Sequence, residues 1–157
     1  MLKNKRILCV VAHPDDEVLG LGGTVHYLTH SAGCSARAVI LGEGVTSRDD
    51  SRDVDKRSGE INSLRLNIEK ARQLIGYDSV GVHDFPDNRF DSIPLLDIIK
   101  VVEEEKNIYK PDVIFTHHGG DLNIDHRRAF EAVLTATRPM KAETVEGIIC
   151  FETPSST

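Results

Sequence analysis

The sequence predicts an α/β fold of the Rossmann-like type, a three-layer sandwich with a mostly parallel sheet between helices. Strand-like and helical segments alternate along the chain. The segments 6–12 and 112–116 are short, continuous apolar runs, which are typical of strands buried on both faces. The chain has 157 residues, a length that favours one domain covering 1–157.

The first half of the chain illustrates the alternation. The strand predicted at 6–12 reads RILCVVA, and the segment 16–30 that follows has apolar residues at helical spacing. A second strand is predicted at 35–41. The polar stretch 43–59 has no periodicity, and long loops of this kind are usually functional.

The second half continues the pattern. The segment 60–75 has an apolar face and is followed by Gly76, a residue favoured just after a helix. Further strands are predicted at 79–85, 112–116 and 147–151, and further helices at 94–108 and 125–137. With right-handed crossovers, the first and fourth strands are expected to be neighbours in the sheet.

Composition excludes several classes of protein. The net charge of −6 gives no basic footprint for nucleic acid, and no apolar run approaches the ~18 residues of a membrane span. The apolar run at the N-terminus is too short for a signal peptide and leads directly into acidic residues. Three cysteines without a CxxC pair favour a reducing, cytoplasmic location.

Polar residues of catalytic type follow two of the predicted strands. In open parallel sheets, ligands bind beyond the carboxyl ends of the strands. After the first strand come His13, Asp15, Asp16 and Glu17, and after the fourth come His117, His118, Asp121, Asn123, Asp125, His126 and Arg127. Several of these residue types bind zinc, so a metal site is predicted between the two loops.

The spacing indicates how such a site would be built. A catalytic zinc ion takes three protein ligands and keeps one position for water. His13 and Asp16 are three residues apart and can reach one point, and His126 can supply the third ligand from the other loop. Asp15 projects elsewhere, where it can take a proton from the water. We therefore expect one Zn²⁺ per chain.

The run Ala12-His13-Pro14-Asp15-Asp16-Glu17, together with the later Asp121-x-Asn123-x-Asp125-His126-Arg127, resembles the PIG-L/LmbE family of zinc-dependent N-deacetylases. Weaker similarities lie at Gly22-Gly23 and at segments 42–47 and 86–91. The resemblance implies that His13, Asp16 and His126 are the zinc ligands and that Asp15 is the general base. It also implies hydrolysis of N-acetylglucosamine-type amides to acetate and a free amine.

The chain departs from the family pattern at two places. Many members have a second histidine three residues before the last ligand, where it polarises the carbonyl; here the residue is Asn123. Either His117 or His118 is expected to stabilise the oxyanion instead. Members of the family are also longer, so the C-terminal part of the family domain is expected to be absent. We expect this form either to self-associate as a homo-oligomer or to be marginally stable.

Four residues are candidates for contact with a small N-acetylated sugar. Asn88 and Arg89 follow the third strand together with Asp87, and this run either contacts sugar hydroxyls or forms a turn. Asn123 and Arg127 flank the last ligand, and Arg127 is alternatively a salt-bridge residue. Asp125 has two interpretations: a carboxylate that orients an imidazole from behind, and an N-cap of the helix that follows.

Two other functions remain open at this stage. The surplus of Asp and His residues could hold a second ion, as in two-metal phosphoesterases, which have two ions ~3.5–4 Å apart. Alternatively, the chain is a truncated, non-catalytic domain that binds metal and sugar. Metal stoichiometry separates the first alternative from a deacetylase, and a turnover assay separates the second.

Overall fold

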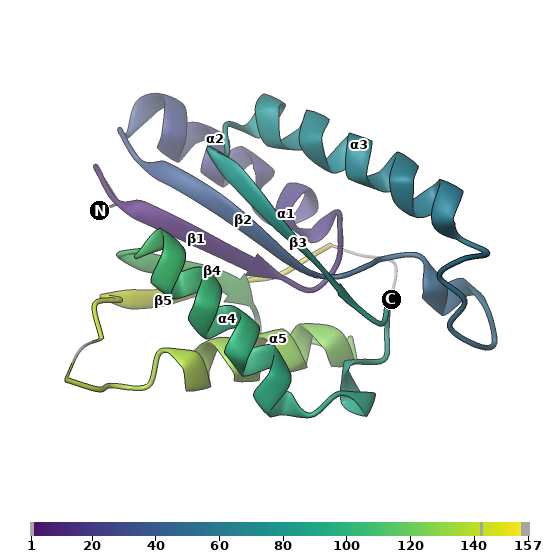
Figure 1. Ribbon diagram of the computed structural model, residues 1–157. Helices are drawn as coiled ribbons and strands as arrows, with labels where there is room; N and C mark the ends of the chain where they lie inside the picture. The colour runs from purple at the N-terminus through teal and green to yellow at the C-terminus, as the bar shows by residue number, and fades with distance from the viewer. Residues whose placement is uncertain (1, 142, 155–157) are drawn as a thin grey trace.

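The computed structural model describes residues 2–141 and 143–154. Five strands form one sheet in the order β3-β2-β1-β4-β5 (Figure 1). They are β1 (Arg6–Val11), β2 (Ser35–Gly42), β3 (Ser79–Phe85), β4 (Val113–His117) and β5 (Gly147–Phe151). Every neighbouring pair is parallel, so the sheet is entirely parallel where the sequence predicted a mostly parallel one.

The helices lie on both faces of the sheet, which confirms the three-layer prediction (Figure 1). One face carries α1 (Asp16–Leu19), α2 (Gly22–Ser31) and α3 (Ser58–Ile75), and the other carries α4 (Leu95–Tyr109) and α5 (Ile124–Ala136). Two short 3₁₀ turns, η1 (Thr46–Arg48) and η2 (Phe90–Ser92), lie in the connections. None of the helices in the described part of the chain is long and apolar enough to cross a membrane.

The central strand β1 supplies side chains to both halves of the core. Leu8 and Val10 belong to the apolar cluster beneath α4 and α5, whereas Ile7 and Cys9 belong to the cluster beneath α2. All four are completely buried. Alternate residues of a strand point to opposite faces, so a strand covered on both sides must be apolar throughout. This explains the continuous apolar run in the sequence.

The prediction of a single helix at 16–30 is wrong, because the helix is interrupted between α1 and α2 at Gly20 and Leu21. The break changes which residues face the sheet: Leu21 and Val25 are buried, while Val18 is 40% exposed. A Cβ atom at Gly20 would lie 2.4 Å from the ring of Phe151. The glycine therefore lets this turn pack closely against the end of β5.

Strand order reverses at β1, with β2 and β3 on one side and β4 and β5 on the other. The loops after β1 and β4 therefore leave the sheet side by side at its carboxyl edge, as predicted.

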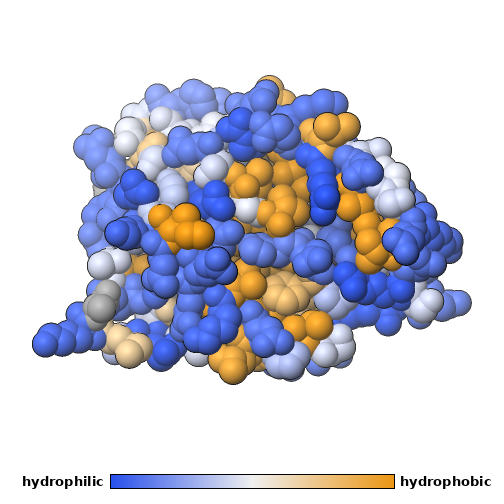
Figure 2. Space-filling view, viewed as in Figure 1, coloured by the Kyte–Doolittle hydropathy of each residue, from blue (hydrophilic) through white to orange (hydrophobic). Residues whose placement is uncertain are grey.

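Edge strand β3 lies between α3 and α4, where Figure 2 shows apolar side chains surrounded by hydrophilic ones; Val82, on β3, is 38% exposed.

Candidate metal and catalytic site

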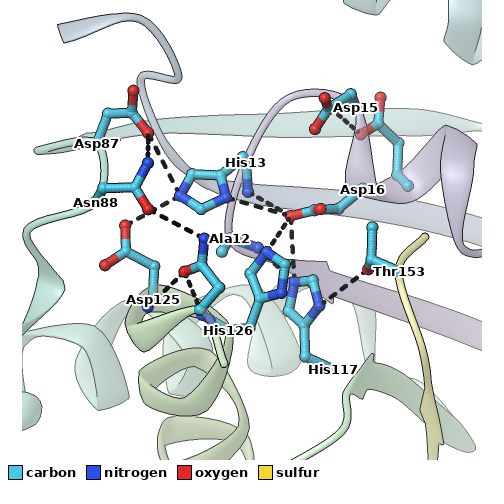
Figure 3. Close-up of polar contacts among 12 residues, drawn as sticks. Ala12, His13, Asp15, Asp16, Asp87, Asn88, His117, Asp125, His126 and Thr153 are labelled. Carbon is cyan, nitrogen blue, oxygen red and sulfur yellow. Dashed lines mark hydrogen bonds and ion pairs between the residues drawn. The ribbon is translucent and has the colours of Figure 1, made fainter. Parts of the chain in front are cut away.

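Three side chains converge beyond the ends of β1 and β4 (Figure 3). His13 follows β1, Asp16 begins α1, and His126 lies in the first turn of α5. Asp16 Oδ2 lies 3.6 Å from His13 Nδ1 and 3.4 Å from His126 Nε2. The three ligand atoms lie within 4.8 Å of one another. Two imidazoles and one carboxylate at this spacing match the donor set of a catalytic zinc site.

The other ring nitrogen of each histidine faces a carboxylate. His13 Nε2 lies 3.0 Å from Asp125 Oδ2, and His126 Nδ1 lies 2.9 Å from Asp121 Oδ2. An ionised carboxylate only accepts hydrogen bonds, so each ring donates its N–H there and offers its remaining nitrogen to an ion. Asp125 thus orients an imidazole, one of the two interpretations given above. Asp121, to which the sequence analysis assigned no role, does the same for His126.

The alternative role of Asp125 as an N-cap is wrong. The cap is Asn123, whose side-chain oxygen accepts hydrogen bonds from the backbone N–H groups of Asp125 (2.8 Å) and His126 (3.4 Å). Asn123 has extended backbone just before the helix, which is the conformation a cap requires. Asp125 is already helical and completely buried, and its second oxygen accepts from Phe90 N at 2.9 Å.

The electrostatics of the site favour a cation. Burial alone would lower the pKa of His13 and His126, but their carboxylate neighbours raise both above the usual value. Burial alone would raise the pKa of Asp16, but the neighbouring rings of His117 and His126 hold it well below the usual value. Negative charge is therefore concentrated around the three candidate ligands. A divalent ion would satisfy this charge when bound.

Asp15 lies on the α1 side of the site, apart from the three converging side chains (Figure 3). Its residue is exposed, and within the described part of the chain its carboxylate accepts no hydrogen bond. Partial desolvation of the carboxylate by neighbouring atoms and the charge of Asp16 raise the pKa of Asp15. Its backbone N–H donates to Glu17 Oε2 at 3.0 Å, which fixes the turn. Its carboxylate thus remains available to a substrate or a water molecule.

The two candidate histidines after β4 occupy different environments. His117 is completely buried, and its ring stacks on His126 with centroids 3.9 Å apart. Its Nε2 accepts a hydrogen bond from Ala12 N at 3.0 Å. Burial lowers the pKa of His117, which favours a neutral ring. His117 has no exposed surface, whereas His118, the other candidate for the oxyanion role, is exposed.

All four sugar-contact candidates have hydrogen-bond partners within the protein. Asn123 caps α5 and donates from Nδ2 to Asn88 Oδ1 at 3.0 Å. Arg127 donates to the carbonyl oxygens of Asp121 (2.7 Å) and Leu122 (2.8 Å). Asn88 is exposed at the turn after β3, and Arg89 is half-buried beside it.

Asp87, expected from the sequence only as part of the turn or sugar-contact run after the third strand, lies beside a candidate metal ligand. It is buried, and its Oδ1 lies 3.4 Å from His13 Nε2. Its Oδ2 accepts from Ser47 Oγ at 2.6 Å, which ties the 43–59 connection to the site. Turn residues such as Pro86 and Asn88 surround it in sequence, and nothing local distinguishes a buried aspartate from a turn aspartate.

Comparison with known proteins identifies relatives of the chain. A model of the PIG-L family, described as GlcNAc-PI de-N-acetylase, matches residues 8–137. The chain is 30% identical over 159 residues to the uncharacterized deacetylase YaiS of Escherichia coli K12, covering 98% of this chain and 77% of that protein. It is also 30% identical over 144 residues to the diacetylchitobiose deacetylase of Thermococcus kodakarensis, with 86% of this chain and 51% of that protein covered. The chain thus spans about half of the archaeal relative.

Solved structures share the fold. The N,N'-diacetylchitobiose deacetylase of Pyrococcus horikoshii superposes with a TM-score of 0.76 at 21% identity, covering 96% of this chain and 61% of that one. GalB, a 4-carboxy-2-hydroxymuconate hydratase from Pseudomonas putida, superposes with a TM-score of 0.66 at 21% identity, covering 92% and 62%. The chain belongs to the PIG-L family, and the predictions of this family and of an amidohydrolase are therefore confirmed.

Proposed function

We propose that the chain is a zinc-dependent N-deacetylase of N-acetylglucosamine-type sugars or sugar conjugates. The observation that carries the proposal is the convergence of His13, Asp16 and His126, with a carboxylate behind each histidine. Family membership supports the reaction class, and the deacetylases of diacetylchitobiose among the similar proteins support the sugar substrate.

Each residue of the site has a separate role in the proposed reaction. His13, Asp16 and His126 would hold a zinc ion, which would supply Lewis-acid activation of a water molecule and of the amide carbonyl when bound. Asp15 accepts a proton from the attacking water and later donates it to the amine nitrogen as the C–N bond breaks. His118 donates a hydrogen bond to the carbonyl oxygen as negative charge develops there. The products are acetate and the free amine.

A single ion is favoured over the two-metal alternative. The other two candidate ligand groups in the described residues are His117, Asp121 and His126, and His13, Asp87 and Asp125. Each shares a histidine with the proposed site, and each uses a carboxylate that already accepts from a histidine ring. An ion bound to a second group would therefore take a carboxylate that orients a histidine of the proposed site.

Substrate contact is proposed for the turn after β3. Asn88 is exposed and Arg89 lies beside it, at the same sheet edge as the metal ligands. The turn is joined to the site by the bond from Asn123 Nδ2 to Asn88 Oδ1 and by Asp87 near His13. Amide and guanidinium groups can donate to the sugar hydroxyls while the acetamide faces the metal site.

The test is amine release from a panel of N-acetylated mono- and disaccharides, measured with the metal-free chain and with one equivalent of zinc. We expect turnover that requires zinc and saturates at one zinc per chain. Sugar binding without amine release would instead favour the non-catalytic alternative, and activation that needs a second equivalent would favour a two-metal site. A hydratase shares the fold, so a reaction that adds water to a double bond belongs in the same panel.

A further inference from the structure

A second histidine pair lies on α2, away from the site described above. His26 and His30 are four residues apart, so both project from the same side of the helix. Both are exposed, and their rings stack with centroids 4.1 Å apart and an angle of 29° between the ring planes. Neither residue belongs to the candidate ligand groups at the carboxyl edge of the sheet.

The hydrogen bonds of His30 decide which of its nitrogens is available. His30 Nδ1 lies 2.9 Å from the carbonyl oxygen of His26, an acceptor, so Nδ1 carries the proton and donates there. The lone pair is then on Nε2. Metal-ligating histidines typically donate their second ring N–H to a carbonyl or carboxylate, and His30 is already bound in this way.

Neighbouring backbone restricts the ring of His30 further. Gly76 ends α3 with φ +97°, and a Cβ atom there would lie 2.7 Å from His30 Cε1. The glycine thus lets the end of α3 close against the last turn of α2, where it limits the movement of the His30 ring. Less side-chain freedom remains to be lost when a ligand binds.

We propose that His26 and His30 form a peripheral binding site for a late first-row divalent cation such as Ni²⁺, Cu²⁺ or Zn²⁺. Imidazole nitrogen suits these ions and suits Mg²⁺ or Ca²⁺ poorly. The site lies at the amino edge of the sheet, because α2 leads directly into the start of β2, whereas the catalytic ligands lie at the carboxyl edge. Its occupancy is therefore independent of the catalytic metal and of the proposed reaction.

The test is calorimetric titration of the zinc-loaded chain with Ni²⁺, with released zinc measured in the filtrate. We expect one Ni²⁺ to bind per chain without release of zinc. Two ligands on one helix act as a chelate, so His26→Gln and His30→Gln should each weaken binding by roughly 10²-fold. His83→Gln, which removes a histidine from β3, is the matched control and should leave the Ni²⁺ affinity unchanged.

Two results would overturn the proposal. Equal Ni²⁺ affinity in the parent chain and in both α2 variants would show that the ion binds elsewhere. A loss of only about half of the Ni²⁺ affinity in each variant would show two separate single-histidine contacts. Circular dichroism of each variant checks that α2 remains folded. Because both side chains are exposed, neither substitution removes core packing.

Discussion

His13 and His126 each use one ring nitrogen for a carboxylate and leave the other for an ion. The two carboxylates come from the same short region, Asp121 in the loop before α5 and Asp125 in its first turn. A histidine whose second ring nitrogen donates to a carboxylate keeps its orientation and its tautomer when the ion leaves. At the scale of single residues, the metal site therefore consists of two histidine–carboxylate pairs and Asp16.

The first prediction concerns one of these pairs. Asp121→Asn should weaken zinc binding by roughly 10–100-fold, because the amide no longer fixes the proton of His126 on Nδ1. A competition titration with a chromophoric zinc chelator measures the affinity. Asp84→Asn, at an exposed position at the end of β3, is the control and should bind zinc like the parent chain. Equal affinity in the two variants would exclude an orienting role for Asp121.

The second prediction concerns the proposed base. Asp15→Asn should retain zinc, since Asp15 is outside the converging ligand group, yet turn over roughly 10²–10⁴-fold more slowly for want of a proton acceptor. Zinc content and the rate of amine release are measured on the same preparation. Loss of zinc from this variant would mean that Asp15 and Asp16 have exchanged roles.

At the scale of elements, the start of α5 determines where two site residues lie. Asn123 holds the first turn through two backbone N–H groups and reaches the β3 turn through Asn88. In many family members this position is the histidine that polarises the carbonyl. In this chain it joins the two loops that flank the metal site.

The third prediction separates the two functions of Asn123. Asn123→Ala should lower the free energy of unfolding by about 1 kcal/mol, the usual effect of losing an N-cap. Asn123→Asp keeps the acceptor for the helix and removes the donor to Asn88, so it should retain most of that stability. Urea unfolding curves of both variants measure the difference. Equal losses would show that the bond to Asn88, and not the cap, stabilises the element.

A buried ion pair joins α4 to strands β2 and β3. Glu105 accepts from Arg37 Nε at 2.9 Å and faces His83 Nε2 at 3.1 Å. Burial alone would raise the pKa of Glu105, but these two partners hold it below the usual value. Gly81 leaves room for the carboxylate, because a Cβ atom there would lie 2.5 Å from Glu105 Oε1.

The fourth prediction follows from this pKa. A carboxyl group with a lowered pKa in the folded state stabilises the fold above its unfolded pKa of about 4.3, and this stabilisation is lost as the pH falls through the folded value. Glu105→Gln should therefore lower stability at pH 7 and flatten its decline in acid. Urea unfolding between pH 7 and pH 3 tests this. Exposed Glu104, changed to Gln, should leave the pH profile unaltered.

At the scale of the whole molecule, the core and the metal site are separate. Completely buried apolar side chains fill both sides of the sheet, whereas the candidate ligands follow the strands or begin helices. The core clusters contain none of these ligands. The fold should therefore persist without metal, and a bound ion should add stability by mass action.

The fifth prediction measures that addition. Free zinc at 100 times its dissociation constant should raise the free energy of unfolding by about 2.7 kcal/mol. Removal of zinc with a chelator should abolish the increase and leave a cooperative unfolding transition. His126→Ala should show the lower stability with and without zinc. If the chain unfolds on chelation, the ion is structural and the core alone is insufficient.

The sequence by itself determined the order of strands and helices and the identity of the candidate ligands. The order of elements follows from apolar periodicity within each segment, and His13 and Asp16 follow from their three-residue spacing. His126 follows from its place after a strand expected to neighbour the first one. Helix bounds at 60–75, 94–108 and 125–137 differ from the structure by at most two residues. The sequence also predicted that β1 and β4 are neighbours, since crossover handedness restricts the order of parallel strands.

Only the tertiary structure decided the partners of the ligands. His13 and Asp125 are 112 residues apart in the chain, so no local pattern reveals that they meet. The same holds for the burial of His117 and for the contact of Gly20 with Phe151, which accompanies the break between α1 and α2. Local residue types specify what a segment can form, whereas contacts between distant loops depend on how the whole sheet and its helices pack.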